Sequence, residues 1–267
     1  MVKVNVLGAS INFYRSTLQQ SDLHVKYYLS NGQSIMETIH DRLHELLGHR
    51  TKSRVLLSEG GGVMRFLPVL RNLQKMEIRG GGFKKATFEE YLSKASCLEC
   101  LSWHGYQYTT IPKIEKNSKL FELDTVELID YRYGLDRNSE LPATDVLKHF
   151  KGRHAFFERS NIATDDVVQF LNDWKSGEKF QNLEIISMRQ RWDIPKIRRL
   201  VEIKVHRKEV VYSFTRKFHD EVPNYPREFK SRSYMVRESD GRVASLLLET
   251  GLIFVGVWNM TENEFLE

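Results

Sequence analysis

The sequence predicts an α/β fold, in which strands and helices alternate as a degenerate leucine-rich-repeat-like array that ends in a C-terminal antiparallel β meander. Three observations predict it. A short apolar pattern recurs at intervals of roughly 20 to 30 residues, as it does in repeat proteins. Residues 163–188 form one complete helix-to-strand unit. The last part of the chain alternates apolar and polar residues between turn signals.

The first sixty residues alternate strand and helix patterns. Residues 2–8 and 53–58 are rich in β-branched and apolar residues, which is typical of strands. Between them, Ser34 and Glu37 form a capping box, and the apolar residues that follow recur at helical spacing. Gly48 can end this helix. We therefore expect a helix over 34–47.

The recurring pattern has three positions: a leading apolar residue, a second one three residues later, and a third, apolar or β-branched, two residues after that. Each occurrence predicts the start of a strand. It occurs at Leu73, Met76 and Ile78; at Leu98, Leu101 and Trp103; at Leu120, Leu123 and Thr125; and at Leu183, Ile186 and Met188. The long gap before Leu183 leaves room for a degenerate strand over 154–159. An ordinary layered α/β domain is the alternative architecture.

Residues 163–188 contain the clearest helix. Thr164 is expected to cap it, and Asp165 and Asp166 interact favourably with the positive end of its dipole. Gly177 ends the helix, and a strand led by Leu183 follows. The spacing predicts a buried stripe of Val167, Phe170, Leu171 and Trp174.

After Trp192 the pattern changes to strands. We expect strand structure through the basic segment 196–208, then a strand ending at Arg237, one over 242–248 and one over 253–258. Asp240-Gly241 and Thr250-Gly251 provide the turns between the last three. The predicted meander would cover the open edge of the array.

Composition limits the classes of protein that this chain can belong to. Its 267 residues, 41% of them hydrophobic, are enough for a packed core. A net charge of +5, with 40 basic and 35 acidic residues, is too balanced for a dedicated nucleic-acid surface. No run of apolar residues predicts a membrane span or a secretory signal, and two cysteines fit a reducing compartment. We expect an intracellular protein, cytoplasmic or nuclear, without membrane association.

Few residues suggest chemistry. Cys97 and Cys100 have the spacing of a zinc or redox pair and His104 lies nearby, but a structural zinc site needs four ligands. His40 and His44 lie four apart without the glutamate of a zinc-protease motif. We therefore expect no catalytic residue, no metal and no cofactor. An enzyme whose site is assembled from distant residues is an alternative.

The basic segment 196–208 is the main alternative functional surface. Its lysines and arginines could bind RNA or another acidic partner. Aromatic residues for base stacking are absent from it, so we favour a solvated edge whose charge discourages association between strands.

The order of these motifs resembles the second type of F-box-associated domain, found in many nematode F-box proteins. In that family a helix of the form DL..FL..W..G precedes a leucine-led strand, and its positions are taken here by Val167, Phe170, Leu171, Trp174, Gly177 and Leu183. The segment RESDGRVASLLLETGLIFVGVW also resembles the family's usual ending, with Trp258 as its last residue. The resemblance covers residues 115–190 well and the meander recognisably.

The resemblance implies the target-binding part of an F-box protein, the substrate adaptor of a cullin-RING ubiquitin ligase. It divides the chain into N-terminal strand-helix repeats (1–114), an F-box-associated region continuous with them (115–190) and the meander (191–267). An F-box pattern is not evident, because Leu67-Pro68 is not followed by an acidic, isoleucine-rich helix. We therefore expect non-catalytic binding of an unknown protein target. The ligase's adaptor subunit would bind only through a cryptic F-box.

Overall fold

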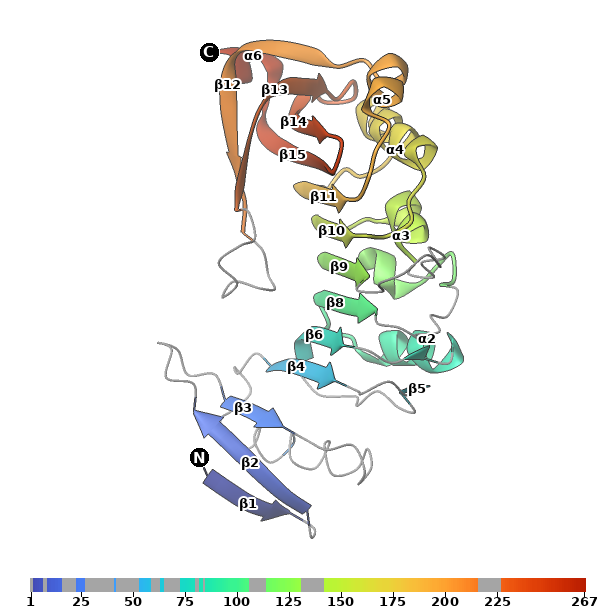
Figure 1. Ribbon diagram of the computed structural model, residues 1–267, viewed down its shortest axis with the longest axis vertical. Helices are drawn as coiled ribbons and strands as arrows, with labels where there is room; N and C mark the ends of the chain where they lie inside the picture. The colour runs from blue at the N-terminus through green and yellow to red at the C-terminus, as the bar shows by residue number, and fades with distance from the viewer. Residues whose placement is uncertain are drawn as a thin grey trace.

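The computed structural model describes residues 2–6, 9–15, 23–26, 41, 53–58, 63–64, 73–79, 82–83, 85–105, 114–130, 142–215 and 227–267. Of the helix expected over 34–47, only Asp41 falls within these ranges; His40, His44, Leu67 and Pro68 lie outside them. The described residues form a mixed α/β fold in which a row of helices lines one side of a long sheet (Figure 1). None of the helices in these ranges is long and apolar enough to cross a membrane.

The main sheet has the strand order β12-β13-β14-β15-β11-β10-β9-β8-β6-β4. Its parallel part runs in chain order from β4 to β11, so that each strand pairs with the next one in this part of the chain. The strands are β4 (Ser53–Ser58), β6 (Leu73–Arg79), β8 (Cys100–Gly105), β9 (Thr125–Asp130), β10 (His154–Glu158) and β11 (Ile185–Arg189). We call this part, with its helices, the parallel array.

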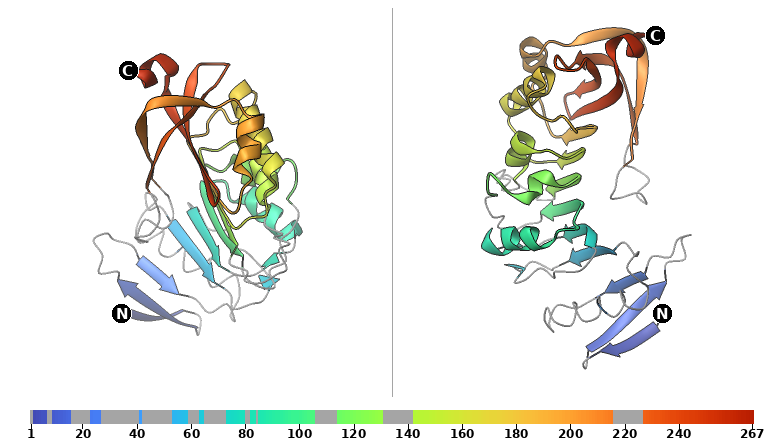
Figure 2. Two further views of the ribbon diagram at one scale, coloured as in Figure 1. Left: turned by 45° about the horizontal axis from the view of Figure 1, so that its top comes forward. Right: turned by 180° about the vertical axis from the view of Figure 1, so that it is seen from behind.

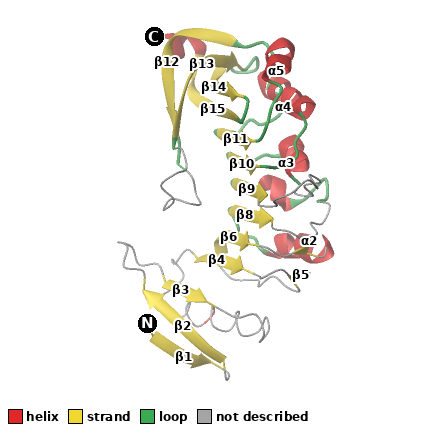
Figure 3. Cartoon of the chain, in the orientation of Figure 1, coloured by secondary structure: helices red, strands yellow, loops and turns green. Residues whose placement is uncertain are grey.

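The helices of the parallel array connect its strands and stack on one another along one face of the sheet (Figure 3). They are α2 (Lys85–Lys94), the 3-10 helix η2 (Lys119–Glu122), α3 (Ala143–His149), α4 (Thr164–Ser176) and α5 (Ile194–Leu200). Because parallel strands require a crossover, this placement gives the units from β6 to β11 the same course: strand, return segment on the helix side, next strand.

Four antiparallel strands complete the sheet. They are β12 (Lys204–Ser213), β13 (Glu228–Val236), β14 (Arg242–Glu249) and β15 (Leu252–Thr261), followed by α6 (Glu262–Leu266). β15 pairs antiparallel with β11, so the meander covers the edge of the array by continuing its hydrogen-bonded ladder. Two smaller sheets contain β1 (Val2–Val6), β2 (Ala9–Arg15) and β3 (Leu23–Lys26), and β5 (Val63–Met64) with β7 (Gly82–Phe83).

Two rows of buried side chains cross the sheet on its helix side. They pack in one cluster with helix residues such as Phe88, Val146 and Trp174. The first row is Met76, Leu101, Val126, Ala155, Ile186 and Val255, and the second is Ile78, Trp103, Leu128, Phe157, Met188 and Ile253. The parallel array and the meander therefore share one continuous core.

A smaller core lies on the other face, where β12 and β13 stand away from the helices (Figure 2). Phe214, just after β12, approaches Phe156 of β10 with ring centroids 6.1 Å apart, and Phe229 stacks on Phe254 at 5.2 Å. The outer strands β12 and β13 thus fold back over the face of β10 and β15 that the helices leave open.

The third occurrence of the repeated pattern was placed in the wrong register. Leu120 lies in η2, and the residues equivalent to the other occurrences are Leu123, Val126 and Leu128. The next unit, whose predicted strand over 154–159 is confirmed as β10, has Gly152 at the leading position. A Cβ there would lie 1.9 Å from the carbonyl oxygen of Leu123, which explains why this unit has no leucine.

Two local predictions were also wrong. Ala163, not Thr164, is the N-cap of α4, and it makes no side-chain capping bond. The basic segment 196–208 is not strand throughout, because Asp193 accepts a hydrogen bond from the amide of Lys196 and starts helix α5. The predicted end of α4 at Gly177 is confirmed, with a left-handed φ of 79°. The strands expected near Arg237, over 242–248 and over 253–258 are confirmed as β13, β14 and β15.

Candidate functional site

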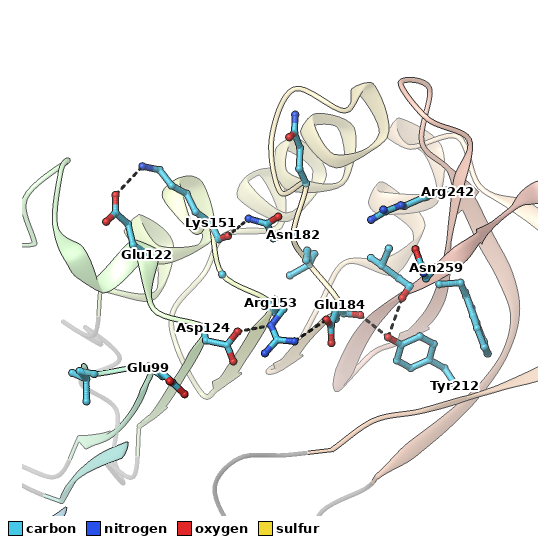
Figure 4. A pocket seen from close by; sticks show the side chains of 16 residues that line it. Glu99, Glu122, Asp124, Lys151, Arg153, Asn182, Glu184, Tyr212, Arg242 and Asn259 are labelled. Carbon is cyan, nitrogen blue, oxygen red and sulfur yellow. Dashed lines mark hydrogen bonds and ion pairs between the residues drawn. The ribbon is translucent and has the colours of Figure 1, made fainter. Parts of the chain in front are cut away.

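A groove of about 840 Å³ lies along the edge of the sheet at which the parallel strands begin (Figure 4). One wall consists of residues that immediately precede β8, β9, β10 and β11, and the other comes from β12, β14 and β15. The groove therefore lies where the parallel array meets the meander.

One residue of each repeat unit stands at the same level of this edge. These residues, which we call the edge row, are Gln74, Glu99, Asp124, Arg153 and Glu184, separated by 25, 25, 29 and 31 residues. Their backbones are joined: the amide of Glu99 donates to the carbonyl of Gln74, and the amides of Arg153 and His154 both donate to that of Asp124. The ladder of the sheet thus fixes the spacing of the row.

Ion pairs connect the middle of the edge row, where one guanidinium lies between two carboxylates. The guanidinium of Arg153 donates to Asp124 over 2.5 Å and to Glu184 over 3.2 Å. Burial raises the pKa of Asp124, but the hydrogen bond and charge of Arg153 outweigh it and hold this pKa below its ordinary value. Glu99, by contrast, is exposed, accepts a hydrogen bond from Gln74, and forms no ion pair with any residue in the described ranges.

Hydrogen bonds from Thr125 through His154 to Glu184 support the edge row from inside the sheet. The two ring nitrogens of His154 lie 3.0 Å from the hydroxyl of Thr125 and 3.0 Å from the carboxylate of Glu184. Burial lowers the pKa of His154 below its ordinary value, although Glu184 opposes the shift.

Burial also raises the pKa of the Cys100 thiol, which next to Thr125 remains a poor nucleophile. Cys100 is buried and Cys97 is exposed; both are free thiols.

Tyr212 joins the meander to the groove. Its hydroxyl donates toward the carbonyl oxygens of Glu184 and Val257, 2.7 and 3.1 Å away. Its ring lies against Gly256, where a Cβ would come within 2.5 Å of it. Trp258 meets Tyr212 edge-on at 5.0 Å and donates its indole hydrogen to Ser245. Trp258 is only partly buried and lines the groove.

The motif residues of α4 do not line the groove. Val167, Phe170, Leu171 and Trp174 are buried in the main core. Leu183 is also buried, but it does contribute to the groove wall. The predicted stripe therefore positions the groove through packing.

The two segments that carry the sequence resemblance contact each other. Arg237 lies over the Trp174 ring at 5.5 Å and donates to Asp240 over 2.8 and 2.6 Å. The amide of Glu238 donates to the carbonyl of Lys175, and Gly177 packs so closely that a Cβ would lie 2.0 Å from the Ser239 hydroxyl. The turn between β13 and β14 is therefore locked onto the end of α4.

A second polar cluster lies on β6, β8 and β9. Ser102 donates to Glu127 over 2.9 Å and meets Nε2 of His104 at 2.9 Å, the same nitrogen that faces Glu77 at 3.7 Å. All four residues are at most 2% exposed. A nucleophilic serine must be reached by its substrate, which this burial prevents.

The basic segment 196–208 is divided between two elements. Lys196 on α5 pairs with Asp165 at 2.6 Å, and Lys204 on β12 pairs with Glu262 at 2.7 Å. Between Val205 and Val210 the register of β12 shifts, and such bulges protect an edge strand against further pairing. Two lysines of the segment are thus engaged in ion pairs, one on each element.

The groove could not have been found from the charge pattern alone, because each edge-row residue has the sequence character of an ordinary surface residue. The one available signal was a polar residue directly after the leading position of every unit. Within the described ranges, no three His, Cys, Asp or Glu side chains gather in a group able to hold a metal ion. No protein-family model, curated protein or solved structure matches this chain.

Proposed function

We propose that this protein is a non-catalytic protein-binding module, resembling the target-binding region of F-box proteins, and that the groove holds its partner. The groove carries this proposal because it combines a concave polar wall with the aromatic side chains of Tyr212 and Trp258. Tyrosine, tryptophan and arginine are the residues that contribute most to protein interfaces.

The architecture supports the proposal. Strands that follow one another in chain order, with their helices on one side and leading positions 25 to 31 residues apart, are what a degenerate leucine-rich-repeat-like array requires. Repeat arrays bind partners along the extended surface that stacking creates. The edge row is such a surface, with one side chain from each unit.

The contact between α4 and the β13–β14 turn supports the resemblance. The resemblance involves two separate segments of sequence, and Trp174 of the first packs against Arg237 of the second. A helix motif and a hairpin motif that depend on each other in space are expected to occur together in one family. The target-adaptor role in a cullin-RING ubiquitin ligase follows from this resemblance.

The position of the groove favours binding over catalysis. Ligands of open α/β enzymes bind outside the carboxyl ends of the strands. This groove lies at the amino ends, and its central charges, Asp124, Arg153 and Glu184, are engaged with one another. Groups already paired in this way hold a surface in shape rather than attack a substrate.

The proposal is tested by affinity capture with three tagged proteins: the wild type, Asn259→Trp and Asn172→Trp. Asn259 is exposed in the groove, and Asn172 is exposed on α4, away from it. We expect target proteins that the wild type and Asn172→Trp retain and that Asn259→Trp loses. Equal capture by all three would overturn the groove as the binding site.

The ligase role needs a separate measurement with purified components. Binding of the ligase's adaptor subunit to the full chain would support recruitment, and the ubiquitination of a captured target would then depend on Asn259. If the adaptor subunit does not bind while targets do, the protein is a binding module that acts without this ligase.

A further inference from the structure

The two ends of the groove carry charges of opposite sign. At the β8 end, the carboxylate of Glu99 is exposed and accepts a hydrogen bond from Gln74, but forms no ion pair with any residue in the described ranges. In the middle, Arg153 lies between two carboxylates. Among the carboxylates of the edge row, the one that a ligand meets without an ion pair to the described residues is therefore Glu99, at the β8 end.

Arg242 provides positive charge at the opposite end, beside Asn259. Its Nε lies 3.4 Å from Asp240, a long contact. Asp240 already accepts two shorter hydrogen bonds from the buried guanidinium of Arg237, at 2.8 and 2.6 Å. One carboxylate thus serves two arginines, which leaves Arg242 with a partly uncompensated positive charge.

The sheet sets the distance between these two ends. Between β8 and β14 lie β9, β10, β11 and β15. With neighbouring strands ~4.8 Å apart, the two ends are separated by about 24 Å, which an extended chain at ~3.3 Å per residue spans with about seven residues. The exposed amides of Gln181 and Asn182 lie along the wall between them, where they can bond a peptide backbone.

We propose that the groove takes an extended peptide segment of a partner protein, with a basic side chain facing Glu99 and an acidic side chain about seven residues away facing Arg242. This inference rests on the proposed function and specifies its target class. The middle of the groove depends less on ligand charge, because Asp124 and Glu184 are both already engaged with Arg153. The partly exposed ring of Trp258 offers an apolar contact near the acidic end.

The test uses a synthetic set of labelled peptides whose two charged positions, seven residues apart, are Lys or Glu in all four combinations. The positions between them are uncharged, and binding to the full chain is followed by fluorescence anisotropy. Both mixed-charge orders, Lys first and Glu first, are tested, because the direction in which the peptide runs along the groove decides which order fits. One of them should bind about tenfold tighter than the Lys-Lys and Glu-Glu peptides, as two exposed ion pairs allow.

Charge reversal assigns each end. Glu99→Lys makes both ends positive and should shift the preference to the Glu-Glu peptide, while Arg242→Glu should shift it to the Lys-Lys peptide. The matched controls are Glu209→Lys and Arg232→Glu, which change the net charge equally at exposed positions outside the groove. These controls should keep the mixed-charge preference. Unchanged preferences in Glu99→Lys and Arg242→Glu would overturn the inference.

The outcomes separate this inference from the proposed function. Peptides that bind without charge preference, but are lost in Asn259→Trp, would sink the charge assignment and leave the groove as a binding site. Peptide binding that Asn259→Trp leaves intact would contradict the groove itself. If none of the four peptides binds while captured proteins still depend on Asn259, the groove recognises a folded surface and the peptide inference fails.

Discussion

The parallel array and the meander differ in how their strands are buried. Every residue of β8 and β9 is buried, whereas most residues of β12 are exposed and only Tyr212 is buried. Strands covered on both faces contribute to stability but have little surface to offer a partner. The outermost strand, β12, has surface but little core. The groove lies at the junction of the parallel array and the meander, so its proposed role in recognition depends on how these two parts pack together.

The largest expected effect concerns the core of the array. Trp174→Ala removes a side chain that is 0% exposed and should cost about 3 to 5 kcal/mol of unfolding free energy. Trp258→Ala, in the meander, should cost less because that ring is only partly buried. Urea unfolding followed by tyrosine and tryptophan fluorescence measures both. Equal losses of unfolding free energy in the two variants would contradict the difference in burial between the array and the meander.

A glycine series tests the lock between them. Gly177→Ala should cost about 1 to 2 kcal/mol for its left-handed backbone, and the overlap with Ser239 adds to this. Gly241→Ala has a φ of 72° but open space around it, so it should pay the backbone cost alone. Gly251→Ala has neither and should stay within about 0.5 kcal/mol. Unfolding midpoints that do not follow this order would contradict the close packing at Gly177.

A pair of tyrosines compares hydrogen bonding in the two parts. Tyr212→Phe removes a hydroxyl that bridges Glu184 and Val257, and should cost about 1 kcal/mol and weaken target binding. Tyr91→Phe, in α2, removes a buried hydroxyl for which the described residues provide no hydrogen-bond partner. It should be neutral or stabilising. A destabilised Tyr91→Phe would show that this hydroxyl has a partner.

The smallest effect depends on pH. Because the pKa of Asp124 is lower in the fold than its ordinary value of 3.8, its ionised form stabilises the protein. That contribution is present above 3.8 and is lost as the pH falls through the lowered value. Asp124→Asn should therefore be less stable than the wild type at neutral pH, and the difference should shrink on acidification. The unfolding free energies of the two proteins are measured as a function of pH. A difference between them that stays constant on acidification would contradict a stabilising role of the ionised Asp124.

The sequence predicted those elements whose signals are local. β4, β10 and the end of α4 were found because alternation, β-branched residues and Gly177 act within a few residues. The turn at Asp240-Gly241 was found for the same reason, and Gly241 has the left-handed φ that the turn requires. Local chemistry decides such elements before tertiary packing acts.

The features that were missed depend on contacts between distant residues. Leu120 and Leu123 are three apart, so either could lead the pattern, and only pairing with β8 selects Leu123. The part of α5 within 196–200 was predicted as strand together with the β-branched residues that follow it, but capping by Asp193 starts a helix there. The edge row and its groove depend on register across five strands, which no single segment encodes.

The pairing of β15 with β11 has a consequence for biosynthesis. β11 ends at Arg189, but the strand that covers its edge begins only at Leu252. At a synthesis rate of about 5 to 20 residues per second, the ribosome needs several seconds to deliver that partner. During this interval the apolar edge of a largely folded array stays unpaired, at the stage when a nascent chain is most open to chaperones and to misassociation.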